Sequence, residues 1–193
     1  MADLTYACLD FLNSDWHDWR GSGLTEDHLD KPEWLKAFSA RWGLAVEGRP
    51  DPAARDALVA LRTLLRRAVD TLAAGRQMST ADLAELNKVI ATWVPRHHLA
   101  PTKHGYRFEL VPPAEDWSWV RAELAMSFAQ LLVDGDPRRI KVCDNPDCRW
   151  VYYDESRNRT RRWCEDTCGN LLKVRRFRAR QKAARPGGGG PAS

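Results

Sequence analysis

The cysteines constrain this chain more than any other feature. Four of the five lie in its last third, as one pair spaced by five residues and one spaced by four, with fifteen residues between the pairs. Such paired spacing is typical of a structural zinc site, in which four thiolates surround one ion. We therefore predict one structural Zn²⁺, and its ligands are Cys143, Cys148, Cys164 and Cys168.

Free thiols and two disulfides are the alternatives to metal. An odd number of cysteines excludes complete pairing within the chain. The start Met1-Ala2-Asp3-Leu4 lacks the basic residues of a secretory signal, and no apolar run approaches the ~20 residues of a membrane helix. We expect a cytoplasmic protein without a membrane segment, in which reduced, metal-bound cysteines are the natural state.

The residues around the cysteines predict a treble-clef arrangement. Asn145-Pro146 favours a turn that brings the first two sulfurs together. Residues 150–153 and 160–163 have the pattern of two short strands, and Cys164 and Cys168 would share one face of a helix. Because this segment has few large apolar residues, we expect it to unfold without metal while the rest of the chain stays folded.

The charge is divided unequally along the chain. Residues 138–185 contain 15 of the 30 Lys and Arg residues but only 6 of the 26 Asp and Glu residues, a balance of +9. The preceding residues have a balance of −5. A positive excess concentrated in the cysteine-bearing segment favours a polyanionic partner.

The segment after Gly169 predicts a cationic helix with one narrow apolar stripe. Val174 and Phe177 fall on that stripe, and we expect them to pack on Trp150 and Tyr152. A run of charged residues often only faces solvent. The absence of acidic residues after Gly169 favours binding to nucleic acid instead. The candidate contact residues are Arg157, Arg159, Arg161, Arg162, Lys173, Arg175, Arg176, Arg178, Arg180 and Lys182.

Hydrophobic periodicity predicts an α+β fold, with a mainly helical domain over residues 1–135 that contains a small β-hairpin. The longest helix signal starts at Asp51-Pro52 and ends before Gly75. Alternation around Gly105 predicts the hairpin. The expected helices are at about 4–14, 34–42, 52–74, 80–90 and 116–133, and the hairpin is at 96–112.

A linker at 134–137 leads to the zinc finger at 138–184, and the glycine-rich residues 186–193 are expected to be disordered. The finger resembles the CGNR zinc-finger family in Ser156-Arg-Asn-Arg-Thr-Arg-Arg-Trp-Cys164 and in Cys168-Gly169-Asn170. Leu171 stands where the family has arginine, so no role of that arginine is carried over.

Members of that family typically join the finger to an N-terminal α+β domain called ABATE, which is associated with stress-induced transcription regulation. The segment Leu9-Asp10-Phe11-Leu12-Asn13 resembles the motif that opens this domain. The resemblance implies a DNA-binding transcription regulator.

A polar segment early in the chain is the candidate site for a small-molecule effector, with capping and surface packing as its other interpretation. Catalysis is not expected, because the finger contains no histidine, and the HExxH, GxxxxGK and zinc-deaminase patterns are absent. The candidate effector-binding residues are Asn13, Trp16, His17 and Arg20.

We therefore expect a zinc-dependent DNA-binding transcription regulator, nucleoid-associated, whose N-terminal domain senses a ligand or partner. One alternative is an RNA- or ribosome-associated module that stacks bases on its aromatic side chains. The other is a small-molecule enzyme that uses the finger for localisation. A homodimer is left open, as are the DNA sequence, the effector and the direction of regulation. In the RNA-binding alternative, the aromatic side chains that would stack on bases are Trp150, Tyr152, Tyr153 and Trp163.

Overall fold

The computed structural model describes residues 4–92, 96–111 and 115–184, and it confirms the α+β class. The predicted tail 186–193 and the end of the predicted hairpin at Pro112 lie outside these residues. The α-helices are α1 Ala7–Leu12, α2 Pro32–Trp42, α3 Pro52–Ala73, α4 Thr80–Ile90, α5 Trp117–Asp134 and α6 Asp166–Ala184. The strands are β1 Asp15–His17, β2 Thr25–Asp27, β3 Arg96–Thr102, β4 Gly105–Val111, β5 Ile140–Val142 and β6 Val151–Tyr153, and short 3-10 turns cover His28–Asp30 and Pro137–Arg139.

Three helices of the N-terminal part begin at side-chain caps that the sequence encodes. The carboxylate of Asp51 accepts a hydrogen bond from the Ala54 N–H at 2.7 Å, and Pro52 occupies the first turn of α3. Ser79 caps α4 in the same way, and Asp116 caps α5. These caps explain why the predicted starts of the three helices agree with the structure.

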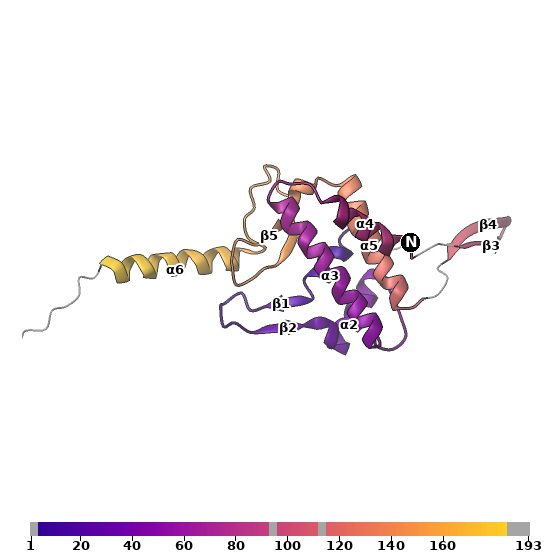
Figure 1. Ribbon diagram of the computed structural model, residues 1–193, viewed down its shortest axis with the longest axis horizontal. Helices are drawn as coiled ribbons and strands as arrows, with labels where there is room; N and C mark the ends of the chain where they lie inside the picture. Colours follow the sequence, from indigo (N-terminus) through magenta and orange to yellow (C-terminus); the bar gives the residue numbers. More distant parts are fainter. Residues whose placement is uncertain (1–3, 93–95, 112–114, 185–193) are drawn as a thin grey trace, which may run out of the picture.

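The helices α1, α3 and α5 contact one another around the main core, and Figure 1 shows α3 and α5 side by side. Fully buried leucines from α3 meet Phe128 of α5 and Phe11 of α1. Burying such side chains contributes roughly 1.5–3 kcal/mol each. The core therefore depends on the apolar faces from which the helices were predicted.

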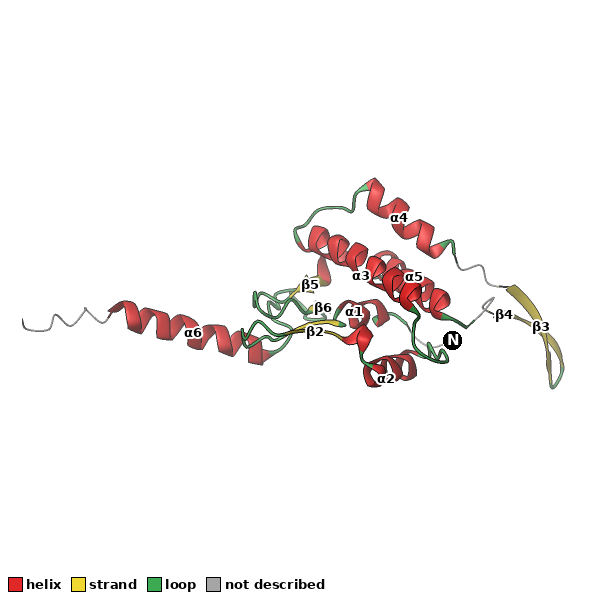
Figure 2. Cartoon of the chain, turned by 60° about the horizontal axis from the view of Figure 1, so that its bottom comes forward, coloured by secondary structure: helices red, strands yellow, loops and turns green. Residues whose placement is uncertain are grey.

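The predicted hairpin exists and projects from one end of the molecule (Figures 1 and 2). Strands β3 and β4 pair antiparallel, and Gly105 stands at the turn with a φ of 145°. At the opposite end, α6 extends away from the body.

A second hairpin, β1–β2, lies in the polar segment for which the sequence predicted no strand. Each strand has only three residues, and Trp16 pairs with Glu26 in its register. So short a pairing has little periodicity to detect. The loop between these strands reaches the cysteine-bearing segment, where Trp19 packs against the cysteine cluster.

The predicted zinc finger does not pack as a separate unit. Strand β6 pairs with β5, which precedes the first cysteine, and Ile140 and Val151 are buried in the main core. Residues 160–163 form no strand. The finger and the helical domain thus share one hydrophobic core across the boundary seen in the sequence.

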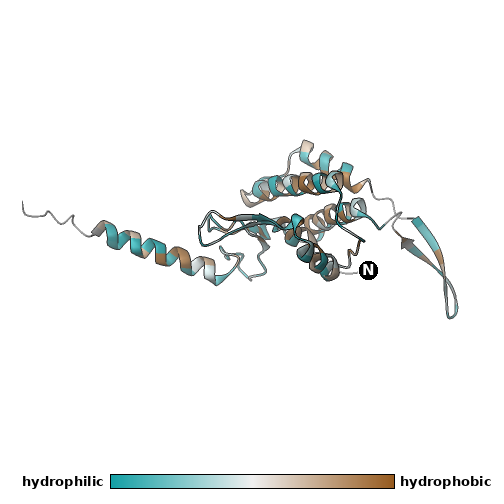
Figure 3. Cartoon of the chain, turned by 90° about the horizontal axis from the view of Figure 1, so that it is seen from below, coloured by the Kyte–Doolittle hydropathy of each residue, from teal (hydrophilic) through white to brown (hydrophobic). Residues whose placement is uncertain are grey.

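The expected packing of the apolar stripe on α6 is also wrong. The side chains of Val174 and Phe177 are 44% and 53% exposed, because α6 extends away from the rest of the described protein (Figure 3). Periodicity located the stripe correctly but could not tell whether anything covers it. The helix is therefore open to solvent on its apolar side as well as on its cationic side.

Candidate metal centre and nucleic-acid interface

The four predicted cysteines converge on one point. Their sulfur atoms all lie within 4.8 Å of one another, and the distances Cys148–Cys164 and Cys164–Cys168 are 3.6 and 3.8 Å. A tetrahedral zinc site with Zn–S bonds of ~2.3 Å requires sulfur separations of about 3.8 Å. The donor set therefore fits one structural Zn²⁺, and the predicted cofactor is confirmed.

A tight turn holds the first two ligands. The Cys143 N–H donates to the Trp150 carbonyl at 2.9 Å, and the Cys148 N–H donates to the Asn145 carbonyl at 2.9 Å. The fully buried Asn145 side chain donates to the Trp19 carbonyl at 2.8 Å and lies 3.6 Å from the sulfur of Cys168. Asn145 thus connects the turn, the β1–β2 loop and a metal ligand.

The four thiols are too close together to ionise independently. Hydrogen bonds from Cys148 and Cys164 lower the pKa of Cys143 well below its ordinary value. Hydrogen bonding to Cys143 and Cys148, together with burial, raises the pKa of Cys164 far above that value. Four thiolates cannot coexist at this distance unless a divalent ion offsets their repulsion.

The second pair of ligands joins the metal to α6. Cys164 precedes the helix and Cys168 lies in its first turn, so the two do not share one helix as predicted. The indole of Trp163 covers this turn. A Cβ at Gly169 would lie 2.9 Å from Cε3 of Trp163, closer than real Cβ contacts. Gly169 is therefore required for the helix to approach the indole.

A charged clamp sets the direction of α6. Arg175 donates to the Asp147 carboxylate at 2.6 Å and to the Arg20 carbonyl at 2.6 Å. Gly21 has a φ of 79°, and a Cβ there would lie 2.5 Å from the Arg175 guanidinium. The β1–β2 loop and the turn between Cys143 and Cys148 therefore both hold the start of α6.

The arginine-rich loop between β6 and the second cysteine pair is ordered by a buried ion pair. The carboxylate of Asp154 is fully buried and accepts from Lys141 at 2.7 Å and from the Arg161 N–H at 3.0 Å. Burial alone would raise the pKa of Asp154, but the hydrogen bonds from Lys141 and Ser156 hold it well below its usual range. Asp154 and Lys141 thus hold the backbone of the loop, while its arginine side chains lie at the surface.

The structure divides the ten predicted nucleic-acid residues into two groups. Four are engaged within the protein: Arg159 with Asp136, Arg161 with the carbonyls of Trp163 and Cys164, Arg162 with Asp144, and Arg175 with Asp147. The other six side chains have no hydrogen-bond or ion-pair partner among residues 4–92, 96–111 and 115–184. These six are Arg157, Lys173, Arg176, Arg178, Arg180 and Lys182.

The predicted effector residues do not gather around one cavity. Asn13 is buried and hydrogen-bonds both the N–H and the carbonyl of Val151, at 2.8 and 2.9 Å. The Trp16 ring stacks on His28. The imidazole of His17 lies 3.3 Å from Asp15, and the Arg20 guanidinium covers the Trp19 ring. Asn13 thus connects the residues before β1 to the finger, a role that polar composition alone does not reveal.

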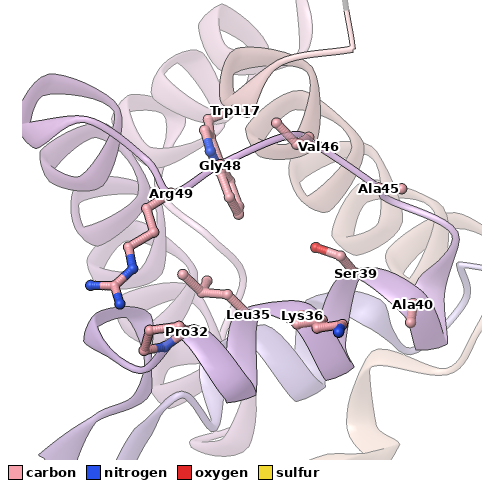
Figure 4. A pocket seen from close by; sticks show the side chains of 10 residues that line it. All are labelled: Pro32, Leu35, Lys36, Ser39, Ala40, Ala45, Val46, Gly48, Arg49 and Trp117. Atoms are coloured by element: carbon pink, nitrogen blue, oxygen red, sulfur yellow. The ribbon is translucent and has the colours of Figure 1, made fainter.

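A cavity of about 400 Å³ lies elsewhere, between α2, the segment after it and Trp117 (Figure 4). Leu35, Val46 and the Trp117 ring form apolar walls, and the Ser39 hydroxyl points inward. Sequence reasoning missed this site. Its residues come from separate elements, and no motif connects them.

Comparison with known families now adds to this geometry. Residues 139–181 match the family described as CGNR zinc finger, and residues 6–135 match ABATE, described as "Putative stress-induced transcription regulator". A comparison with curated proteins finds no match. Within the part of the chain that the structure describes, no helix is long and apolar enough to cross a membrane. The chain belongs to the ABATE family and carries a CGNR zinc finger with four cysteine ligands at its C-terminal side.

Proposed function

We propose that the protein is a DNA-binding transcription regulator in which the zinc-held helix α6 contacts the DNA. One observation carries the proposal: α6 extends from the body (Figure 1) while five of its six described basic side chains have no partner among the described residues. The sixth, Arg175, binds Asp147 and helps to seat the helix.

The charge on α6 favours binding to an external anion. After Asp166 the helix contains no acidic residue, so its cations meet like charges at spacings of three and four residues. Such pairs destabilise an isolated helix. The phosphates of a nucleic acid would remove this repulsion and release bound counterions, which strengthens binding at low salt.

The shape of α6 suits the major groove of duplex DNA. A helix with side chains is ~10–12 Å wide, and the groove is ~12 Å wide. At about 1.5 Å per residue, the 19 residues of α6 reach roughly 28 Å from the metal. Arg176, Arg178 and Arg180 supply guanidinium forks that bind phosphate or guanine edges.

RNA is the second candidate, and the packing of the aromatic residues argues against it. Tyr152 is only 8% exposed, and the Tyr153 hydroxyl accepts from the Asp136 N–H. Trp163 packs against the cysteines, which leaves Trp150 as the more accessible ring, at 37% exposure. A stacking surface for several bases is therefore poorly supported.

We also propose that the metal has a structural and not a catalytic role. The four cysteines supply the complete set of ligands for tetrahedral zinc, whereas catalytic sites keep a position for water or substrate. The role of these residues is to hold the ion so that Cys168 anchors the first turn of α6.

For the sensing role, the apolar cavity of Figure 4 is the best-supported site. Lys36 and Arg49 flank it and have no partner among the described side chains. The Trp117 indole N–H likewise finds no acceptor in the described part of the protein. An apolar small molecule that carries an acidic group fits this combination.

The test is selection of bound fragments from random duplex DNA by the full chain. A Cys164→Ser variant is the control, because it removes a ligand without changing the charge of α6. We expect enriched sequences for the wild type and none for the variant. Equal recovery of unrelated duplexes by both proteins, or a preference for single-stranded RNA, would overturn the proposal.

A further inference from the structure

A second cationic surface lies apart from the exposed face of α6, where helix α3 meets the turn between Cys143 and Trp150. Five arginines and two aspartates contribute to a groove of about 570 Å³, together with two threonines. We call it the arginine groove. Its five arginines are Arg62, Arg66, Arg67, Arg76 and Arg149.

Two of these arginines are paired with carboxylates of the protein. Arg62 donates to both carboxylate oxygens of Asp27, at 2.7 and 2.6 Å. Arg67 pairs with two acids of α4, Asp82 and Glu85. Their positions are thus fixed by the fold, and their charges are largely satisfied.

The other three arginines lack such partners. Among the described residues, no carboxylate approaches Arg66, Arg76 or Arg149 more closely than the 4.0 Å between Arg66 and Asp70. Arg66 donates to the Arg149 carbonyl at 2.6 Å, which brings two cations together. Burial, followed by the charge of Arg149, lowers the pKa of Arg66. Asp15 is the other acid of the groove, and it lies beside His17.

The backbone of Arg149 gives an independent indication that its side chain is needed there. Its φ of 54° lies in the left-handed region, where a side chain costs about 1–2 kcal/mol and glycine costs nothing comparable. Residues kept in such conformations concentrate at functional sites. The only polar contact of the Arg149 side chain within the described residues is a weak one of 3.5 Å to His17, so the fold gains little from it.

We propose that the arginine groove binds a phosphorylated small molecule whose phosphate groups lie between Arg149 of the finger and Arg66 and Arg76 of the helical domain. Planar guanidinium groups bind phosphate oxygens in pairs, and the volume suits a small organic phosphate. Such a ligand bridges both parts of the chain beside the metal. Phosphates of the DNA backbone share this chemistry, so the test separates the two sources.

The test is calorimetric titration of the zinc-loaded full chain with inorganic pyrophosphate at low salt. Two variants remove groove cations: Arg76→Gln, and Arg149→Gly, which keeps the Arg149 carbonyl and removes only the weak 3.5 Å contact to His17. A third variant, Arg178→Gln on α6, removes an equal charge outside the groove. Zinc content is measured after each titration, because pyrophosphate also binds zinc and all variants retain the four cysteines.

We expect one site in the wild type, a loss of affinity of at least about tenfold in both groove variants, and no loss in Arg178→Gln. Arg149→Gly should unfold at the same or higher urea concentration than the wild type. Absence of pyrophosphate binding would overturn the proposal, as would equal binding by all four proteins. If groove variants lose duplex binding while none binds pyrophosphate, the groove belongs to the DNA interface. Failure of Arg178→Gln to weaken DNA binding would instead contradict the role of α6.

Discussion

Replacing Asn13 tests whether the helical domain and the zinc finger form one folding unit. The Asn13 side chain is 6% exposed and satisfies both backbone groups of Val151, which is 1% exposed. In Asn13→Ala, both groups stay buried without a partner, which costs about 1–3 kcal/mol each. We therefore expect the free energy of unfolding to fall by about 2–6 kcal/mol.

The measurement is urea-induced unfolding followed by tryptophan fluorescence, together with the rate of zinc release to a chromogenic chelator. Because Val151 belongs to the shared core, the variant should lose zinc faster, although Asn13 lies far from the cysteines in sequence. Asn87→Ala is the matched control, since Asn87 is exposed on α4. The reasoning is refuted if Asn13→Ala unfolds within about 0.5 kcal/mol of the wild type, or if the wild type unfolds in two separate steps.

Three further predictions concern other parts of the structure. Gly169→Ala should destabilise the finger by about 1–3 kcal/mol and speed zinc release, because its Cβ would meet the Trp163 indole; unchanged release would contradict this. Burial raises the pKa of Asp27, but hydrogen bonds from Arg62 more than offset this and lower it. Its contribution is therefore complete above the unfolded pKa of about 3.9 and lost as pH falls through the lower folded value. Urea unfolding between pH 3 and 7 should thus show a flatter acid dependence for Asp27→Asn, and parallel curves would refute it. Anilinonaphthalene sulfonate should bind the cavity of Figure 4 and quench Trp117; Arg49→Gln should weaken this, and equal binding by both proteins would count against the site.

The metal centre was predictable from the sequence because its geometry is encoded locally. Cysteine spacing and the turn at Asn145-Pro146 are enough to bring two sulfurs together, and no other four-thiol set exists in the last third of the chain. The helices were predictable for the same reason. Their caps and apolar periods lie within a few residues of each other.

What the sequence could not reveal depends on contacts between distant residues. The roles of Asn13 and Arg175 follow from partners that lie 138 and 28 residues away. The polar composition of the β1–β2 segment suggested a ligand site, whereas the Asn13 side chain and the Arg20 carbonyl bind residues of the finger. The exposure of Phe177 also required the structure, because an apolar stripe looks the same whether it is covered or free.

The strand pattern at 160–163 shows a third limit. Alternating residues there resemble a strand, but the backbone is held instead by Lys141 and Asp154, whose buried ion pair contacts the loop. Local propensity is overridden wherever a tertiary contact supplies the backbone hydrogen bonds.

The salt dependence of duplex DNA binding tests the central claim most directly. If α6 and the finger neutralise roughly five phosphates, the logarithm of affinity should fall with the logarithm of salt concentration with a slope of about −4 to −5. Changing Arg176, Arg178 and Arg180 together to glutamine should reduce this slope by about 2.7 without loss of zinc. A slope near zero in the wild type, or an unchanged slope in the triple variant, would contradict the assignment of α6 as the DNA-binding element.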